Sequence, residues 1–165
     1  MRPVTERDIR ASFVNCSKGE ARRLNLPKDF PGLPWDDLDF LGWRDPRAPE
    51  RAYLVADRGG RLTGVALRAA GGASRGFTAR SMCSLCLTTR TSGAVTLMTA
   101  RRTGEAGRRG DSVGRYMCGD LDCSLYVRGV RQTVGGGGPE ESLTREEKIA
   151  RIAGNVEEFL AGVTR

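Results

Sequence analysis

Four of the five cysteines in the chain lie in two close pairs. Two residues separate Cys83 from Cys86, four separate Cys118 from Cys123, and residues 87–117 lie between the pairs. Structural zinc ions are held by four ligands in a tetrahedron, and a gap of two to four residues lets each pair turn around the ion. The spacing therefore predicts one Zn²⁺ ion bound by these four cysteines.

The chain contains no histidine, which excludes the usual general base and the serine–histidine–aspartate arrangement of many hydrolases. No cysteine is followed two positions later by glutamate, as zinc deaminases require. A zinc ion closed by four thiolates has no open position at which water could be activated. We therefore predict a structural zinc ion, no catalytic residues, no enzymatic activity and no small-molecule substrate.

Several features of the sequence indicate a cytoplasmic protein without a membrane partner. Residues 1–8 are charged and lack the apolar segment of a signal peptide, and no run approaches the roughly 18 apolar residues of a membrane span. Cytoplasmic thiols stay reduced, so cysteine pairs there bind metal more often than they form disulfides. Cys16 lies far from both pairs, and we expect it to be a small buried residue rather than a fifth ligand.

The positive charge of the chain is concentrated around the predicted zinc site. The formal net charge of the chain is +7. The segment from Arg68 to Arg131 contains eleven arginines and four acids, so its own net charge of +7 equals that of the whole chain. A basic excess of this kind suits a polyanion such as RNA or an acidic protein, and it also occurs on ordinary solvated surfaces. The sequence leaves these three interpretations open.

The segments around the cysteines read mainly as strands. Residues 51–56 and 61–68 flank the turn Asp57-Arg58-Gly59-Gly60 and predict a β-hairpin, and the strand around Trp43 is expected in the core. Residues 93–100 and 112–117 predict a second hairpin between the ligand pairs, closed by a basic, glycine-rich loop. A short helix is expected over residues 124–128. A ligand pair, a hairpin, a second ligand pair and a helix follow one another as in a treble-clef zinc finger.

Helices are predicted at both ends of the chain. Thr5 is a good N-cap for a first helix. Thr144 and Glu147 form a capping-box pattern before the longest apolar stripe at helical spacing. The fold class is therefore α+β: an antiparallel sheet with a treble-clef zinc finger, an N-terminal helix and a C-terminal amphipathic helix. We expect residues 1–38 to be a short helical lead-in packed on a zinc-finger domain of residues 39–165.

Three segments together resemble a known family. They are Cys83-x2-Cys86, the run from Gly114 to Cys123 (Gly-Arg-Tyr-Met-Cys-Gly-Asp-Leu-Asp-Cys), and the final helix with Asn155-Val156-Glu157-Glu158-Phe159-Leu160. This combination resembles the C-terminal treble-clef zinc-finger domain of the elongation factor G-binding proteins (FusB/FBP type), which are known for fusidic acid resistance. The resemblance covers roughly residue 39 to the end. Family members carry a helical bundle before this domain, where this chain has room for one or two helices.

The resemblance implies a non-enzymatic protein that binds translation elongation factor G and promotes its release from the ribosome. It implies contacts through the zinc-finger face and the last helix, and the corresponding residues are Leu85, Tyr116 and Phe159, with Arg115 added on charge alone. The same residues also suit other roles, because Leu85 and Tyr116 could pack over the zinc cluster and Phe159 could lie in the core. The alternative function is an RNA- or ribosome-binding zinc-finger protein that uses its arginine-rich face.

Overall fold

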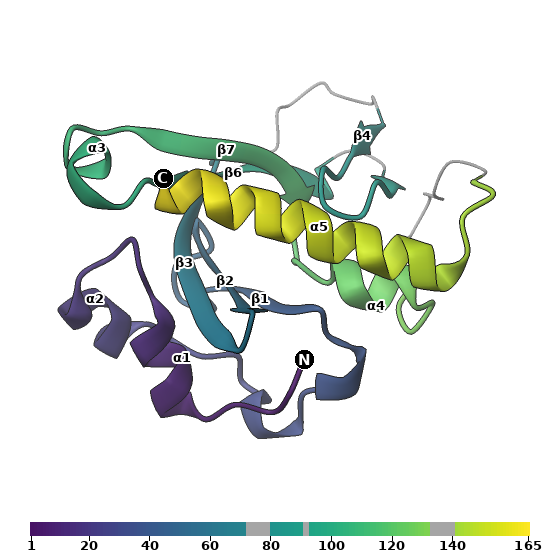
Figure 1. The fold of residues 1–165 in the computed structure, drawn as a ribbon, viewed down its shortest axis with the longest axis horizontal. Helices are drawn as coiled ribbons and strands as arrows, with labels where there is room; N and C mark the ends of the chain where they lie inside the picture. The colour runs from purple at the N-terminus through teal and green to yellow at the C-terminus, as the bar shows by residue number, and fades with distance from the viewer. Residues whose placement is uncertain (72–79, 91–92, 133–140) are drawn as a thin grey trace.

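An antiparallel sheet of five strands forms the centre of the computed structural model (Figure 1), which describes residues 1–71, 80–90, 93–132 and 141–165. The strand order is β1-β2-β3-β6-β7, and every neighbouring pair is antiparallel. The bounds are β1 (Phe40–Arg44), β2 (Arg51–Arg58), β3 (Arg61–Ala69), β6 (Val95–Arg101) and β7 (Ser112–Cys118). The short strands β4 (Ser81–Met82) and β5 (Thr89–Arg90) form a separate two-stranded ribbon. Both predicted hairpins are thus confirmed, at β2–β3 and at β6–β7.

Three of the five α-helices in the described part of the chain begin at a capping box. The helices are α1 (Glu6–Ser12), α2 (Lys18–Arg23), α3 (Gly104–Arg108), α4 (Cys123–Val127) and α5 (Arg145–Thr164), with 3₁₀ turns η1 (Phe30–Gly32) and η2 (Trp35–Asp37). Thr5 and Thr144 form the capping boxes expected from their surroundings, and Ser17 forms a third at α2. The mixed helical and antiparallel fold class, with a helix near each end, is confirmed.

One segment predicted as a loop contains a helix. The short helix α3 lies within residues 101–110, and the structure shows why this connection is ordered. The backbone N–H of Thr103 donates to the carbonyl of Val163 at 2.9 Å, and the guanidinium of Arg102 donates to the carbonyl of Gly162. These bonds attach the hairpin loop to the last turn of α5. This is a tertiary contact, so the local sequence of the loop does not predict it.

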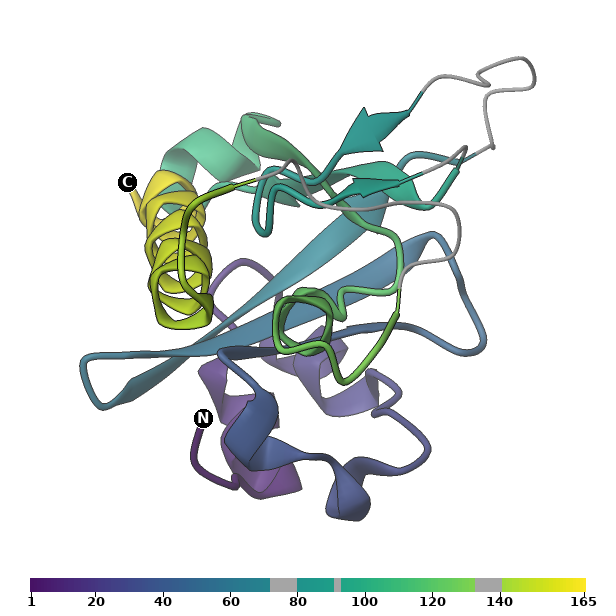
Figure 2. The same ribbon diagram turned by 90° about the vertical axis from the view of Figure 1, so that its right-hand side faces the viewer.

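Elements on both sides bury the sheet (Figures 1 and 2). The helix α5 covers one face, and α1, α2 and the two 3₁₀ turns cover the other. Strand β2 shows the consequence, because Leu54 belongs to the core under α5 whereas Tyr53 and Val55 belong to the core under the N-terminal helices. Side chains alternate between the two faces of a strand. Because both faces of β2 are covered, its successive apolar residues enter the two cores in turn. Trp43 lies in the second core, as predicted.

The N-terminal segment is attached to the sheet by its backbone. Phe13 forms a parallel bridge to Gly64 in β3, and the N–H of Val14 donates to the Gly64 carbonyl at 2.9 Å. The side-chain amide of Asn15 exchanges two hydrogen bonds with the backbone of Ala66, at 2.7 and 3.0 Å. The division of the chain into units at residue 38 stays a prediction. No helix in the described part of the chain combines the length and hydropathy needed to cross a bilayer.

We predict that Gly64→Ala destabilises the protein, because a Cβ atom at this position would lie 2.5 Å from the Oγ atom of Ser12. Overpacking of this kind costs about 1–3 kcal/mol, measured as the free energy of unfolding in urea. Gly32→Ala is the matched control, since no heavy atom lies within 4 Å of its added Cβ. An equal loss in both variants would contradict the close approach of α1 to β3.

Candidate metal centre

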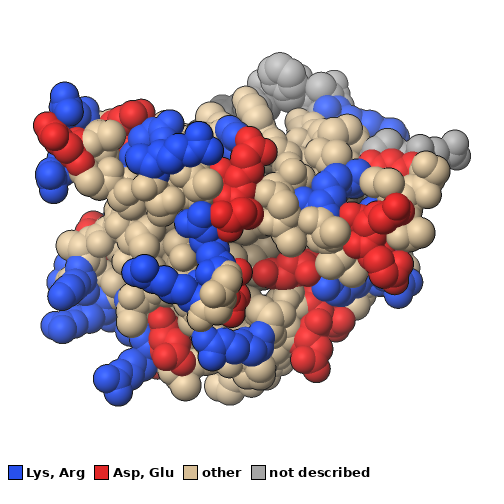
Figure 3. All heavy atoms as spheres, in the orientation of Figure 1, with Lys and Arg blue, Asp and Glu red and all other residues tan. Residues whose placement is uncertain are grey.

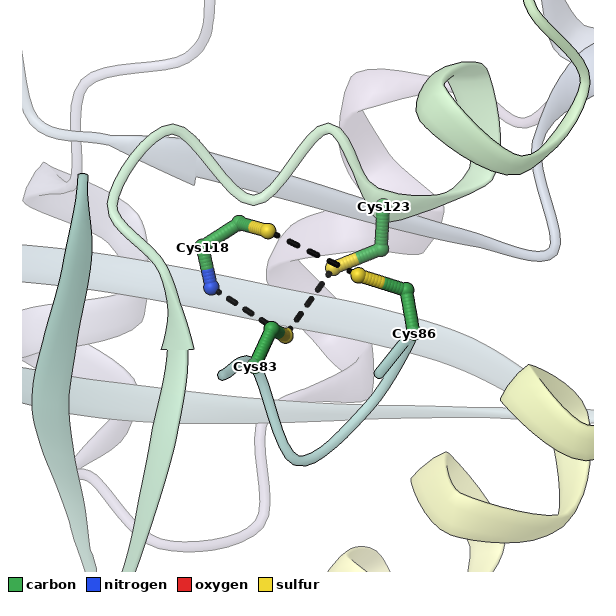
Figure 4. A group of neighbouring side chains, drawn as sticks. All are labelled: Cys83, Cys86, Cys118 and Cys123. Carbon is green, nitrogen blue, oxygen red and sulfur yellow. Dashed lines mark hydrogen bonds between the residues drawn. The ribbon is translucent and has the colours of Figure 1, made fainter. Parts of the chain in front are cut away.

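The fold brings the two cysteine pairs together from three parts of the chain (Figure 4). Cys83 and Cys86 occupy the turn between β4 and β5, Cys118 ends β7, and Cys123 begins α4. All four side chains are buried, and their Sγ atoms lie within 4.8 Å of one another. Such a cluster of thiols, sealed from solvent, matches the closed ligand set of a structural metal site.

The distances between the sulfurs fit zinc. Cys83 Sγ lies 3.7 Å from Cys123 Sγ, and Cys86 Sγ lies 3.7 Å from Cys118 Sγ. A tetrahedron with Zn–S bonds of about 2.3 Å has edges of about 3.8 Å, whereas a disulfide would require about 2.05 Å. The four cysteines are therefore positioned to bind one metal ion, and a single structural zinc fits the donor set and its geometry.

Backbone groups stabilise the thiolate form of Cys83. The N–H groups of Leu85 and Cys118 donate to Cys83 Sγ at 3.4 and 3.3 Å. Because thiolates are the zinc ligands, these contacts favour the ionised form that the metal needs.

Two leucines in the ligand turns adopt a left-handed backbone conformation. Leu87 has φ 55° and Leu121 has φ 63°, values uncommon for bulky residues. Each closes a turn, since the N–H of Leu87 donates to the Cys83 carbonyl at 2.9 Å and that of Leu121 to the Cys118 carbonyl at 3.0 Å. Such conformations cost about 1–3 kcal/mol each, so the surrounding contacts and the metal must hold them.

A positive side chain that sequence reasoning missed lies beside the cysteines. Arg90 is buried, with its guanidinium 4.4 Å from the centre of the Tyr126 ring and 3.3 Å from Asp120 Oδ2. Tyr126 donates its hydroxyl to the same carboxylate at 2.5 Å. Desolvation alone would lower the pKa of Arg90, but its contacts with Cys118 and Asp120 outweigh burial and raise that pKa. Arg90 is thus a permanent positive charge beside four thiolates, whose combined charge with Zn²⁺ is negative.

The structure separates the predicted partner-contact residues into two groups. Leu85 is 1% exposed and Phe159 is fully buried, both in the core under α5, so the prediction that these two side chains contact a partner is not supported. Asn155 of α5 donates to the Leu85 carbonyl at 2.8 Å, which places Leu85 between the first cysteine pair and the helix. Leu85 therefore joins the zinc turn to α5, and Phe159 belongs to the same core.

The other two predicted residues lie at the surface. Tyr116 is 56% exposed on β7, and the side chain of Arg115 is 40% exposed and forms an ion pair with Glu158 at 3.3 Å. Met82, which sequence reasoning missed, is 47% exposed directly before the first ligand, Cys83. In the sequence, Met82 is recognisable only as an apolar residue next to a metal ligand. That position does not show whether its side chain is exposed or buried.

Cys16 lies apart from the metal cluster. It is half-buried in the loop between α1 and α2, and the four-cysteine cluster found among the described residues does not include it. Burial is the main cause that raises the pKa of its thiol to about 11, and nearby Glu20 adds to the shift. Cys16 therefore stays protonated at neutral pH and is neither a fifth ligand nor an activated nucleophile.

The comparisons with known proteins agree with this site. A family model described as the FBP C-terminal treble-clef zinc-finger matches residues 8–163. Among solved structures, that of the fusidic acid resistance protein FusC is similar, with a TM-score of 0.50 and 13% sequence identity, over 88% of this chain and 53% of that chain. This chain spans about half the length of the FusC chain, and at this identity the likeness concerns the fold alone. No curated protein matches the chain.

We predict that Cys118→Ser abolishes stoichiometric zinc binding and lowers the melting temperature, because a site with three thiolates holds zinc poorly and zinc binding contributes to folding. Zinc content by plasma mass spectrometry and a thermal melt measure the two effects. Cys16→Ser is the matched control and should keep one zinc ion per chain. Full zinc content and an unchanged melt in Cys118→Ser would refute the assignment.

We also predict that Arg90→Met weakens zinc binding by about tenfold, since residues that support metal ligands typically contribute 10–100-fold to metal affinity. Competition with a chromogenic chelator measures this effect, and Arg90→Lys should restore part of it because it restores the charge. Arg61→Met, at the exposed β2–β3 turn, controls for loss of one positive charge. If Arg90→Met and Arg61→Met retain zinc equally, Arg90 has no role at the metal centre.

Proposed function

Because the chain belongs to the family of FBP C-terminal treble-clef zinc-finger proteins, we propose that it is a non-enzymatic protein that binds translation elongation factor G and promotes its release from the ribosome. The described fold, similar to that of a fusidic acid resistance protein, supports a role in translation. A metal closed by four buried cysteines offers no position for a substrate, which supports a binding role for the zinc finger.

The observation that carries this proposal is the exposed apolar surface beside the metal centre. Among the large hydrophobic residues described, three are exposed: Met82, Tyr116 and Val130. Two of these, Met82 and Tyr116, adjoin the ligand pairs, and the N–H of Ser84 donates to the Tyr116 carbonyl at 2.7 Å, which ties their two segments together. Exposed tyrosine and methionine side chains are enriched at protein interfaces, where tyrosine often dominates the binding energy.

The zinc ion gives this surface a fixed shape. Tyr116 lies two residues before Cys118, and Met82 lies one residue before Cys83, so the metal holds both backbone segments. A rigid surface loses less conformational entropy when a partner binds, which leaves more of the contact energy as affinity. Arg115, the neighbour of Tyr116 in β7, pairs with Glu158 of α5, and because successive side chains of a strand point to opposite faces, Tyr116 is presented on the face of β7 away from α5. Binding to elongation factor G places the protein in the cytoplasm, where the ribosome works.

We expect the zinc-loaded chain to bind purified elongation factor G in a 1:1 complex, measured by isothermal titration calorimetry. Tyr116→Ala should weaken the complex by at least tenfold, a loss typical of a central aromatic contact. Val130→Ala, which truncates a similarly exposed residue after α4, should bind like the wild type. Absence of heat at micromolar concentrations would reject the partner, and equal affinities of the two variants would reject the surface.

A further inference from the structure

The arginines of the zinc region are largely occupied within the protein. Of the ten described arginines between Arg68 and Arg131, six form ion pairs with acids. The pairs are Arg90–Asp120, Arg102–Asp111, Arg109–Glu105, Arg115–Glu158, Arg128–Asp39 and Arg131–Asp122. The Arg128–Asp39 pair is partly buried and bidentate, at 2.7 and 2.9 Å. The charge that the sequence concentrates around the metal is thus used in large part to hold the fold.

A different surface concentrates positive charge. A groove of about 1240 Å³ runs between α2 and α3, and its walls also include residues 45–51, β3 and β6. Seven arginines line it: Arg23, Arg47, Arg51, Arg68, Arg101, Arg102 and Arg108. All but Arg102 are exposed. Figure 3 shows lysine and arginine side chains at the left of the molecule, over α2 below and α3 above. Three of these arginines precede the segment in which the sequence concentrates its charge.

The two acids of the groove have structural roles. Glu20 accepts hydrogen bonds from the N–H and hydroxyl of Ser17 at 2.8 and 2.7 Å in the capping box of α2. Asp45 is buried and accepts from the side chain of Asn25 and the N–H of Arg47, both at 2.9 Å. Seven arginines stand against these two acids in the lining. Asp111 and Glu50, which pair with Arg102 and Arg51 from just outside it, reduce the formal excess to three positive charges. A concave surface of one sign focuses the field on an anionic ligand.

We propose that this groove binds the phosphodiester backbone of a nucleic acid without reading its base sequence. Arginine presents a planar fork of donors that matches phosphate oxygens, and arginines from five separate segments can follow a chain of phosphates. The one aromatic side chain of the lining is Tyr53, which is buried and shares Asp45 as a hydrogen-bond partner. With no exposed ring in this lining, the groove offers no platform on which bases could stack.

An acidic protein segment fits the groove less well. Protein interfaces draw most of their energy from buried apolar or aromatic anchors. The exposed residues of these walls are six arginines, Glu20 and small residues, namely Ser17, Gly104, Gly110 and Ser112. None of Met82, Tyr116 and Arg115 lines the groove. A nucleic acid and elongation factor G could therefore bind to different surfaces, and this inference does not depend on the proposed function.

The test is fluorescence anisotropy with the zinc-loaded chain and labelled 20-nucleotide RNA and DNA of the same sequence, titrated at several salt concentrations. The double variant Arg68→Gln/Arg101→Gln removes two charges from the groove. The double variant Arg7→Gln/Arg145→Gln removes two exposed charges elsewhere and is matched in net charge. Circular dichroism and zinc content verify that both variants fold. Unlabelled poly-glutamate serves as a competitor of similar charge.

We expect the groove variant to bind at least about tenfold more weakly and its log–log salt slope to fall by about two, one for each lost phosphate contact. The control variant should keep the wild-type slope, and poly-glutamate should compete poorly. The stronger of the RNA and DNA curves then identifies the natural source of the backbone. Equal losses in the two double variants, no binding of either nucleic acid, or tighter binding of poly-glutamate would overturn the proposal.

Discussion

The convergence of four sulfur atoms on one point is the constraint on which the rest of the structure depends. It joins the β4–β5 turn to the end of β7 and the start of α4, although the two cysteine pairs are separated by residues 87–117. The turns that allow it hold Leu87 and Leu121 at positive φ. Structural zinc sites supply about 10–16 kcal/mol of apparent binding energy at neutral pH, which far exceeds the roughly 1–3 kcal/mol that each such residue costs. A bound zinc ion would therefore supply more than enough free energy to hold both turns.

Glycines at close contacts let the remaining elements approach this centre. A Cβ atom on Gly42 in β1 would lie 2.5 Å from the Cβ of Leu121, so the loop between the second pair of ligands rests directly on the first strand. On the opposite face, Gly64 allows the same approach by α1. The sheet is thus held between the zinc finger with α5 and the N-terminal helices, and β2 is buried on both faces. Disturbing either contact should be felt on both faces of the sheet, because β2 contributes side chains to each of the two cores and protein interiors are close-packed.

The arginine side chains have two different roles in the structure. Around the metal, Arg90 and Arg128 are paired with Asp120 and Asp39 in poorly exposed positions, where a lone charge would be costly. In the groove between α2 and α3, Arg23, Arg47, Arg68, Arg101 and Arg108 are exposed and form no ion pair among the described residues, so their positive charges face solvent together. The first arrangement stabilises the fold, and the second suits an external polyanion. Net charge alone could not have distinguished them.

Local patterns were enough to predict much of the fold and the metal ligands. These predictions used features that can be read from the order of residues alone: the cysteine spacing, the absence of histidine, the Thr5 and Thr144 caps and the alternating strands. The zinc site, both hairpins and the terminal helices could therefore be predicted. Which side chains of those elements meet depends on packing between distant segments. The sequence could not show that Leu85 and Phe159 are buried together while Tyr116 is exposed. Nor could it show that Arg90 lies beside the thiolates, or that arginines from residue 23 to residue 108 line one groove. The sequence determined the elements and the metal, and only the tertiary structure decided which surfaces remain for partners, because burial is a property of the contacts between elements.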